Sequence, residues 1–186
     1  TDVTITIVRP PAHWPAIDSA APPLARDHAP LRGVLFPDII RPTDFPTLKT
    51  WNVNVVRWIM DNYPVDMAQV SMADFDAWVD AEIVKLDQTL VLAKANGQKV
   101  LIAMFDTPGG READGTLRML FDASMEEHFI AAWAKLANSY RDNPAVFAYG
   151  LVNEPVQSRL VPPGMPDWLE LQVKAARAIR EIDAKT

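Results

Sequence analysis

The sequence of 186 residues contains no cysteine, which excludes disulfide scaffolds, thiolate nucleophiles and cysteine-based zinc sites. Its three histidines, His13, His28 and His128, show no ligand spacing, so we expect no metal and no cofactor. No apolar run approaches the roughly 18 residues that cross a membrane, so we expect no membrane partner. The chain starts at Thr1 without a basic and then apolar leader, which suggests processing or cutting from a longer protein.

Basic residues are also in short supply. The chain has 18 Lys and Arg against 24 Asp and Glu, a formal net charge of −6, which disfavours nucleic acid as a partner. Hydrophobic residues make up 49%, enough for a substantial core. Nine of the 16 prolines fall in the first 46 residues, and proline discourages both helix and central strand. We therefore expect a proline-rich N-terminal arm over residues 1–30 and one folded domain over 31–186.

Short apolar runs alternate with longer segments of helical period from Leu31 onward. Nearly continuous apolar runs are typical of parallel strands that are covered on both faces. The predicted strands are LRGVLF at 31–36, NVVRWIM at 54–60, KVLIAMF at 99–105 and AVFAYGLV at 145–152.

Each predicted strand is followed by a predicted helix. The first helix is short, at 44–51. The second carries apolar residues every three or four positions from Phe75 to Ala93, with Ser71 as its cap and Gly97 at its end. The third spans Met125 to Tyr140 before Asn143, and the fourth begins near Asp167. Strand and helix in strict alternation predict an α/β fold with a parallel sheet. The length falls short of the roughly 250 residues of a complete (β/α)8 barrel.

Carboxylates follow the ends of these predicted strands. Asp61 follows the second strand, Asp106 the third and Glu154 the fourth, while Arg57 lies inside the second. In α/β barrels the loops at the carboxyl ends of the strands converge on one cavity, so we expect these residues at a common site.

The segment FIAAWAKLANSYRDNPAVFAYGLVNEP at 129–155 resembles glycoside hydrolase family 5, a cellulase-like family of retaining enzymes on (β/α)8 barrels. The fourth strand of that family ends in Asn-Glu-Pro, after a helix that contains a Trp and a Tyr. Further matches occur in the family's order: RGVLF, NVNVVRW, KVLIAMFDTPGG and VKAARAIREIDAKT. The resemblance covers about residues 31–186 and implies the parallel (βα)4 half of a TIM barrel.

The resemblance implies hydrolysis of a β-linked glucan or mannan in a secreted protein. Glu154 is then the general acid/base, Asn153 binds the 2-hydroxyl of the sugar, and Arg57 orients a carboxylate from beneath. We expect Asp106 to contact substrate, and we expect Trp58 and Trp51 to stack on sugar rings, because aromatic rings pair with apolar sugar faces. The alternative is that Glu154 is a solvated loop carboxylate and that Arg57 is structural.

Two departures from the family pattern matter. Phe105 occupies the place of a His at the end of the third strand. The nucleophile, a Glu on the family's seventh strand, has no counterpart in these four βα units. An acid/base without its partner carboxylate predicts an incomplete site.

Four parallel strands also leave two unpaired edges and an apolar inner face. We expect a homodimer that closes an eight-stranded barrel, in which two Glu154 carboxylates 6.5 to 9.5 Å apart would suit inversion. The alternatives are a second chain that supplies the other half, a fragment of a full enzyme, and a non-catalytic half barrel that self-associates and at most binds carbohydrate.

Overall fold

The computed structural model describes residues 30–37, 40–63 and 65–186, and Leu31–Thr186 form one compact unit. The arm predicted over residues 1–30 therefore lies outside the described residues, apart from Pro30. The strands are β1 (Gly33–Pro37), β2 (Val55–Met60), β3 (Lys99–Met104) and β4 (Val146–Gly150). The helices are α1 (Asp44–Thr50), α2 (Met72–Asn96), α3 (Ala123–Tyr140) and α4 (Trp168–Arg180), with 3-10 turns at Met67–Gln69 and Arg118–Leu120.

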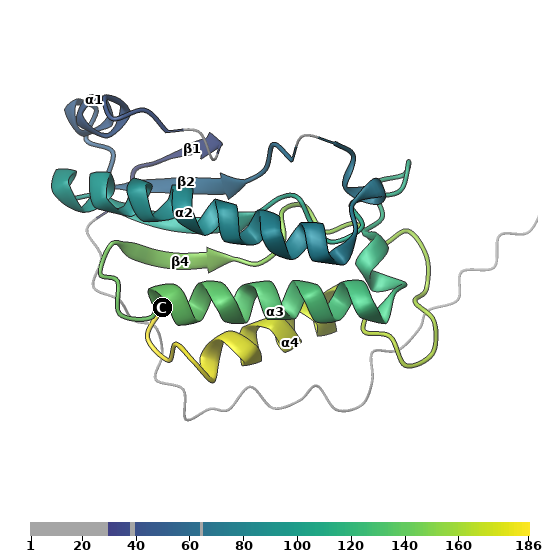
Figure 1. The fold of residues 1–186 in the computed structure, drawn as a ribbon. Coiled ribbons are helices and arrows are strands. Elements are labelled where there is room, and N and C mark those ends of the chain that lie inside the picture. Colours follow the sequence, from purple (N-terminus) through teal and green to yellow (C-terminus); the bar gives the residue numbers. More distant parts are fainter. Residues whose placement is uncertain (1–29, 38–39, 64) are drawn as a thin grey trace, which may run out of the picture. The chain divides into compact units, whose positions relative to one another are not determined.

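The four strands form one parallel sheet in the order β1-β2-β3-β4 (Figure 1). Every predicted strand is confirmed, and each is followed by a helix, as in the first half of a TIM barrel. The register shifts between Val100 and Leu101 of β3, which pair with Val146 and Ala148 of β4. The parallel half-barrel architecture is thus confirmed, whereas its completion to eight strands by a second copy stays a prediction.

The helix ends follow the predicted signals, with one addition. The hydroxyl of Ser71 accepts the Asp74 amide (3.1 Å) at the start of α2, and Gly97 ends that helix at φ 72°. Glycine suits this left-handed position because it has no Cβ. A complete capping box occurs at α4, where Asp167 accepts the Glu170 amide and the Glu170 carboxylate accepts the amide of Asp167.

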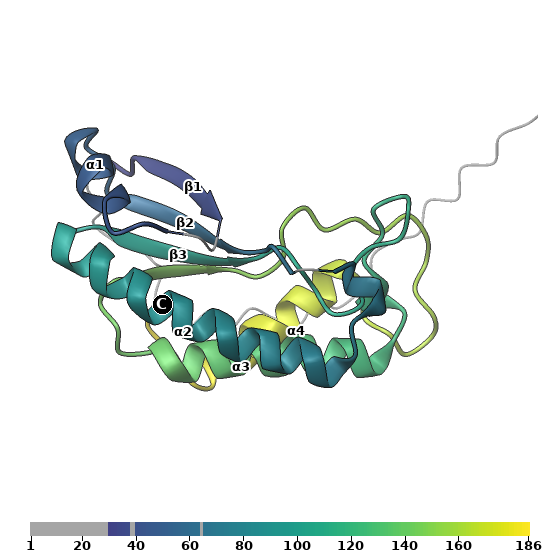
Figure 2. The same ribbon diagram turned by 45° about the horizontal axis from the view of Figure 1, so that its top comes forward.

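Helices α2, α3 and α4 lie together on one face of the sheet (Figure 2). Successive side chains of a strand point to opposite faces. In β2, Val56, Trp58 and Met60 belong to the buried core shared with these helices. Arg57 between them therefore points to the other face, which corresponds to the inner face of a barrel.

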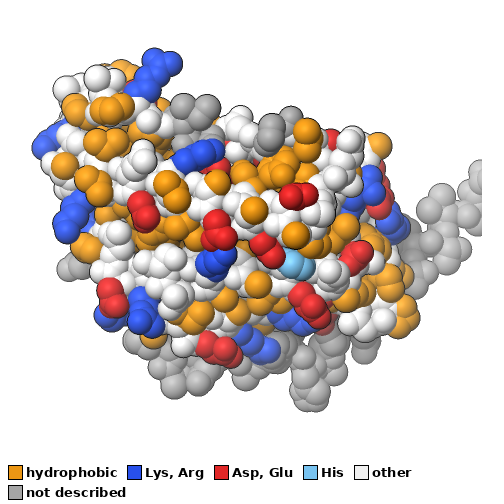
Figure 3. All heavy atoms as spheres, viewed as in Figure 1, with side chains coloured by type: hydrophobic (Ala, Val, Ile, Leu, Met, Phe, Trp, Pro, Cys, Tyr) orange, Lys and Arg blue, Asp and Glu red, His pale blue; other side chains and the backbone are white. Residues whose placement is uncertain are grey.

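The outer surface of α2 and α3 mixes charges of both signs with apolar side chains (Figure 3). Asp80 pairs with Lys135 (2.5 Å), and Asp76 contacts His128 (2.9 Å), so polar contacts at this surface join α2 to α3. Exposed pairs of this kind contribute little to stability. None of the described helices is long and apolar enough to cross a membrane.

Candidate functional site

The fourth strand leads directly into the candidate site. Beyond Gly150, the Asn153 amide donates to the Met104 carbonyl (3.0 Å), so the chain stays beside the end of β3. The Asn153 side chain is 9% exposed. This places Asn153 and Glu154 at the carboxyl edge of the sheet, the edge where barrels of this type carry their chemistry.

Arg57 reaches Asn153 from the middle of β2. Its neighbours in register are Leu35 on β1 and Leu101 on β3. The guanidinium Nη2 donates to Asn153 Oδ1 at 2.8 Å. This charge-assisted bond joins two strands through residues 96 positions apart. The structure brings these two sequence-predicted residues together through the amide oxygen of Asn153, and the orientation of a carboxylate by Arg57 stays a prediction.

Glu154 has an exposed side chain and an unusual backbone. Its φ is 44°, in the left-handed region that a residue other than glycine rarely adopts. Such conformations persist where the surrounding contacts determine them, and they cluster at functional sites.

Arg111, on the loop between β3 and α3, supplies those contacts. Its guanidinium donates to the carbonyls of Asn153 (Nη2, 2.5 Å) and Glu154 (Nη1, 2.9 Å), and also to that of Gly115 (3.1 Å). The same guanidinium lies 5.8 Å from the centre of the Phe105 ring. Sequence reasoning missed Arg111, because a bond between loops 42 residues apart leaves no local pattern.

Phe105 lies just beyond the end of β3 and is 38% exposed. It follows Ala103 and Leu101 at every second position, so it lies on the inner side of the sheet with Arg57. Where the family resemblance leads us to expect a histidine, this chain has an apolar ring beside Arg111. Its partly exposed ring lies beside Arg111, which bonds to the carbonyls of Asn153 and Glu154.

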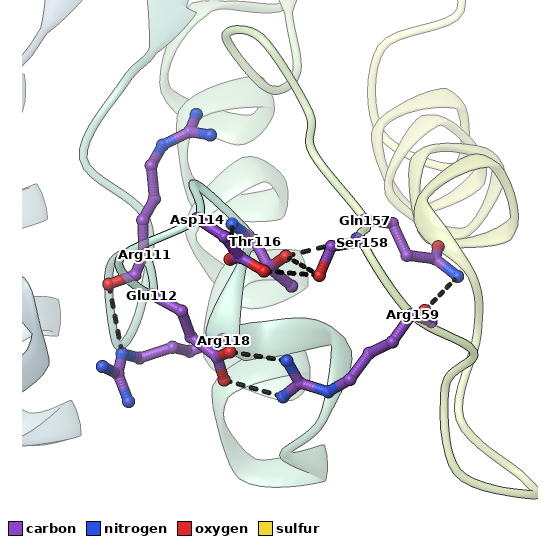
Figure 4. A network of polar contacts seen from close by, with 8 residues as sticks. All are labelled: Arg111, Glu112, Asp114, Thr116, Arg118, Gln157, Ser158 and Arg159. Carbon is purple, nitrogen blue, oxygen red and sulfur yellow. Dashed lines mark hydrogen bonds and ion pairs between the residues drawn. The ribbon is translucent and has the colours of Figure 1, made fainter.

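The loops after β3 and β4 are held together by a second set of contacts (Figure 4). The guanidinium of Arg159 donates to both carboxylate oxygens of Glu112 (2.5 and 2.7 Å) and stacks 4.0 Å from the Phe121 ring centre. The hydrogen bond from Arg159 lowers the pKa of Glu112, and the same bond raises the pKa of Arg159.

Asp114 forms the other half of this contact set. Its carboxylate accepts the Ser158 hydroxyl (2.6 Å) and the Thr116 amide (2.9 Å). These bonds, the one from Ser158 first, lower the pKa of Asp114 to about 2. The loop after β3 and the loop that carries Glu154 are therefore tied by polar bonds at several points.

Two sequence-predicted sugar-stacking residues lie elsewhere, and those predictions are wrong. Trp58 is 0% exposed within the core, so its ring offers no face to a sugar. Trp51 is 65% exposed, but it follows α1 and precedes β2, at the amino end of the strands. The site lies at the opposite edge.

Asp106 does lie at the carboxyl edge. Its Oδ2 accepts the backbone amide of Tyr63 (3.1 Å), and its own amide donates to Met60 (3.2 Å). The carboxylate thereby joins the end of β3 to the loop after β2. Contact of Asp106 with substrate stays a prediction.

The arrangement sets what the site can do chemically. The exposed carboxyl group of Glu154, whose backbone is held next to the buried Asn153, can exchange a proton with a bound oxygen atom. The described residues contain no group of three His, Cys, Asp or Glu side chains placed to hold a metal ion.

Comparison with known proteins identifies the family of this chain. The sequence pattern of the cellulase family, glycosyl hydrolase family 5, matches residues 25–186. Endoglucanase C of Acetivibrio thermocellus is 26% identical over 150 residues, 80% of this chain and 41% of that protein.

Solved structures agree with this match. Endoglucanase Cel5A of Pseudomonas stutzeri is 26% identical with a TM-score of 0.56 over 78% of this chain and 41% of that one. Endo-glycoceramidase II of Rhodococcus sp., at 18% identity and a TM-score of 0.58 over 82% of this chain and 46% of that one, shares the fold. The chain spans about two fifths of the length of the curated relatives it matches. The chain belongs to glycosyl hydrolase family 5, and its four βα units correspond to one half of that family's barrel.

Proposed function

We propose that this chain carries the acid/base half of an endoglucanase site, with Glu154 as the general acid/base. One observation supports this most strongly: Arg57 holds Asn153 at 2.8 Å, directly beside Glu154 at the carboxyl edge of the sheet. Asn153 binds the 2-hydroxyl of the sugar, a hydrogen bond that strengthens in the transition state. Glu154 protonates the leaving oxygen.

The substrate class we propose is a β-linked glucan. The relatives above are named endoglucanases, and Cel5A of Pseudomonas stutzeri has been solved in complex with cellobiose. The exposed ring of Phe105 offers an aromatic surface that suits the apolar face of a glucose ring. Mannan is the alternative, and a direct comparison of the two polymers decides between them.

Hydrolysis of a glycosidic bond requires a second carboxylate, about 5 to 5.5 Å from the first in a retaining enzyme. In the family that carboxylate lies on the seventh strand, beyond the four strands of this chain. We propose that a second half barrel supplies it, on a continuation of this chain, on another copy or on another polypeptide. Retention of the anomeric configuration follows if the second half carries the family's nucleophile.

Hydrolysis of soluble β-1,4-glucan and of mannan by the purified chain tests this proposal. Glu154→Gln removes the ionisable group and keeps its shape, so we expect a loss of about 10²- to 10⁴-fold. Glu112→Gln is the matched control, since Glu112 lies at the same edge but pairs with Arg159. The control should keep the activity within a few-fold. A rate on glucan that survives Glu154→Gln would remove Glu154 from the mechanism.

A second candidate function is a half barrel without activity that self-associates and at most binds carbohydrate. Leu35, on the sheet face that carries no helix within the described part of the chain, is 57% exposed. Covering such apolar surface with a second copy is favourable. Light scattering should then give twice the monomer mass, and Leu35→Ser should shift the protein toward the monomer. A monomer at micromolar concentration would exclude the homodimer.

We also infer that the protein is secreted, because a polymeric glucan is met outside the cell. Fractionation of a producing culture tests this, with the chain expected in the medium. Recovery of the chain only with the cells would contradict it.

A further inference from the structure

We propose that Arg111 is a positioning residue that sets the backbone of Glu154 and so aims its carboxylate. The claim that Arg111 sets the Glu154 backbone depends only on the contacts of Arg111. The claim that this backbone setting affects catalysis rests on the proposed function. Arg111 needs no contact with substrate for this role.

The two bonds from Arg111 hold both peptide groups that flank the Glu154 Cα. The Asn153 carbonyl belongs to the peptide before that atom, and the Glu154 carbonyl to the peptide after it. Fixing the planes of both peptides fixes φ and ψ of Glu154 together. This accounts for a glutamate that keeps φ at 44°, where an L side chain is strained.

The shape of the guanidinium group suits this task. Nη1 and Nη2 donate in one plane to two carbonyls in succession along the chain, which a lysine ammonium cannot reproduce with the same geometry. The third bond, to the Gly115 carbonyl, ties Arg111 to its own loop. Phe105 lies beside the guanidinium at 5.8 Å. The Arg111 guanidinium is thus held in place by residues of its own loop.

Arg159 provides a matched comparison. It joins the same two loops through Glu112 but has no bond to the Asn153 or Glu154 carbonyls among its described contacts. Figure 4 shows the Arg111 side chain directed away from the Glu112 and Arg159 pair. If Arg111 only joins the two loops, substitution of Arg111 and substitution of Arg159 should have similar effects on the Glu154 backbone. If Arg111 positions Glu154, only its own substitution should have such an effect.

NMR of the carbonyl carbons of Asn153 and Glu154 in the ligand-free labelled chain tests this. We expect Arg111→Ala and Arg111→Lys to shift both signals, and Arg159→Ala to leave both at their original positions. Guanidinium ion added to Arg111→Ala should restore the signals, and ammonium at equal concentration should not. Unchanged signals in Arg111→Lys, or equal shifts in Arg159→Ala, would overturn the proposal. Arg111→Lys decides the matter if Arg111→Ala fails to fold.

Kinetic measurements on β-1,4-glucan test whether the positioning of Glu154 by Arg111 affects catalysis. A misplaced acid/base lowers kcat, so Arg111→Ala should reduce kcat by about 10- to 100-fold with KM within a few-fold. Arg159→Ala should retain both constants. Because the carbonyl signals are recorded without substrate, a chain that hydrolyses no glucan even when its second half barrel is present refutes the proposed function and leaves the conformational role of Arg111 to be decided by NMR. A normal kcat in Arg111→Ala with shifted signals would overturn the aiming of the carboxylate.

Discussion

Removal of the Asn153 side chain should destabilise the fold through Arg57. The guanidinium of Arg57 donates to Asn153 Oδ1 at 2.8 Å, and the asparagine is 9% exposed. Asn153→Ala deletes the acceptor and leaves a half-buried cation between Leu35 and Leu101. A hydrogen bond to a charged group contributes about 1.5 to 3 kcal/mol. Because water can reach Arg57 in part, we expect a loss of about 2 kcal/mol in the free energy of unfolding.

A double-mutant cycle isolates this bond. Asn153→Ala, Arg57→Met and the double variant are unfolded in urea and followed by tryptophan fluorescence. The two single changes should sum to more than the double change, with a coupling of about 1 to 2 kcal/mol. In thermal unfolding, Asn153→Ala alone should lower Tm by about 4 to 8 °C for a chain of this length. Asn153→Ala combined with Arg159→Ala serves as the additive control, since Arg159 pairs with Glu112. A coupling below about 0.5 kcal/mol between Arg57 and Asn153 would refute the reasoning.

Two further predictions concern the loops at this edge. A Cβ on Gly110 would lie 2.9 Å from Met67 Cβ at φ 62°, so Gly110→Ala should cost about 2 kcal/mol or more, measured by urea unfolding. Gly97→Ala, at φ 72° with open space around it, should cost only about 1 kcal/mol, and equal costs would contradict the clash. The lowered pKa of Asp114 means that the bond to Ser158 is complete above about pH 4 and is lost as the pH falls through about 2. NMR titration of this carboxyl should show its pKa rising toward 3.8 in Ser158→Ala, and an unchanged pKa would contradict the assignment.

The strands and helices could be predicted because their signals are local. The continuous apolar runs mark parallel strands, and Ser71 and Gly97 mark the ends of α2. Asn153 and Arg57 could be brought together as well, because the order of strands in a half barrel places the ends of β2 and β4 at one edge. Local sequence pattern and strand topology together therefore suffice to place Arg57 and Asn153 at one site.

Trp58 and Trp51, which were predicted to stack on sugar rings, show where the same reasoning failed. Arg57 and Trp58 are adjacent in β2, and adjacent side chains of a strand point to opposite faces. Assigning Arg57 to the site should therefore have placed Trp58 in the core. Trp51 precedes the strand, which puts it at the amino end. Both errors could have been avoided from the sequence.

Arg111 was beyond the reach of the sequence. Its partners are backbone carbonyls, which carry no residue identity, and its position depends on the path of an irregular loop. Only three-dimensional coordinates bring it to Glu154. The left-handed backbone of Glu154 is hidden for the same reason, since the neighbouring proline constrains it without specifying φ 44°.

The central claim is that a β-glucan lies at the carboxyl edge beside Asn153 and Glu154. Titration of the isotopically labelled chain with cellotetraose, followed by amide NMR, tests it most directly. We expect saturable shifts clustered at Asn153, Glu154 and Arg111, and no change at the indole of Trp51 at the opposite end of the strands. Saturable shifts centred on Trp51, or none at the carboxyl edge, would contradict the account.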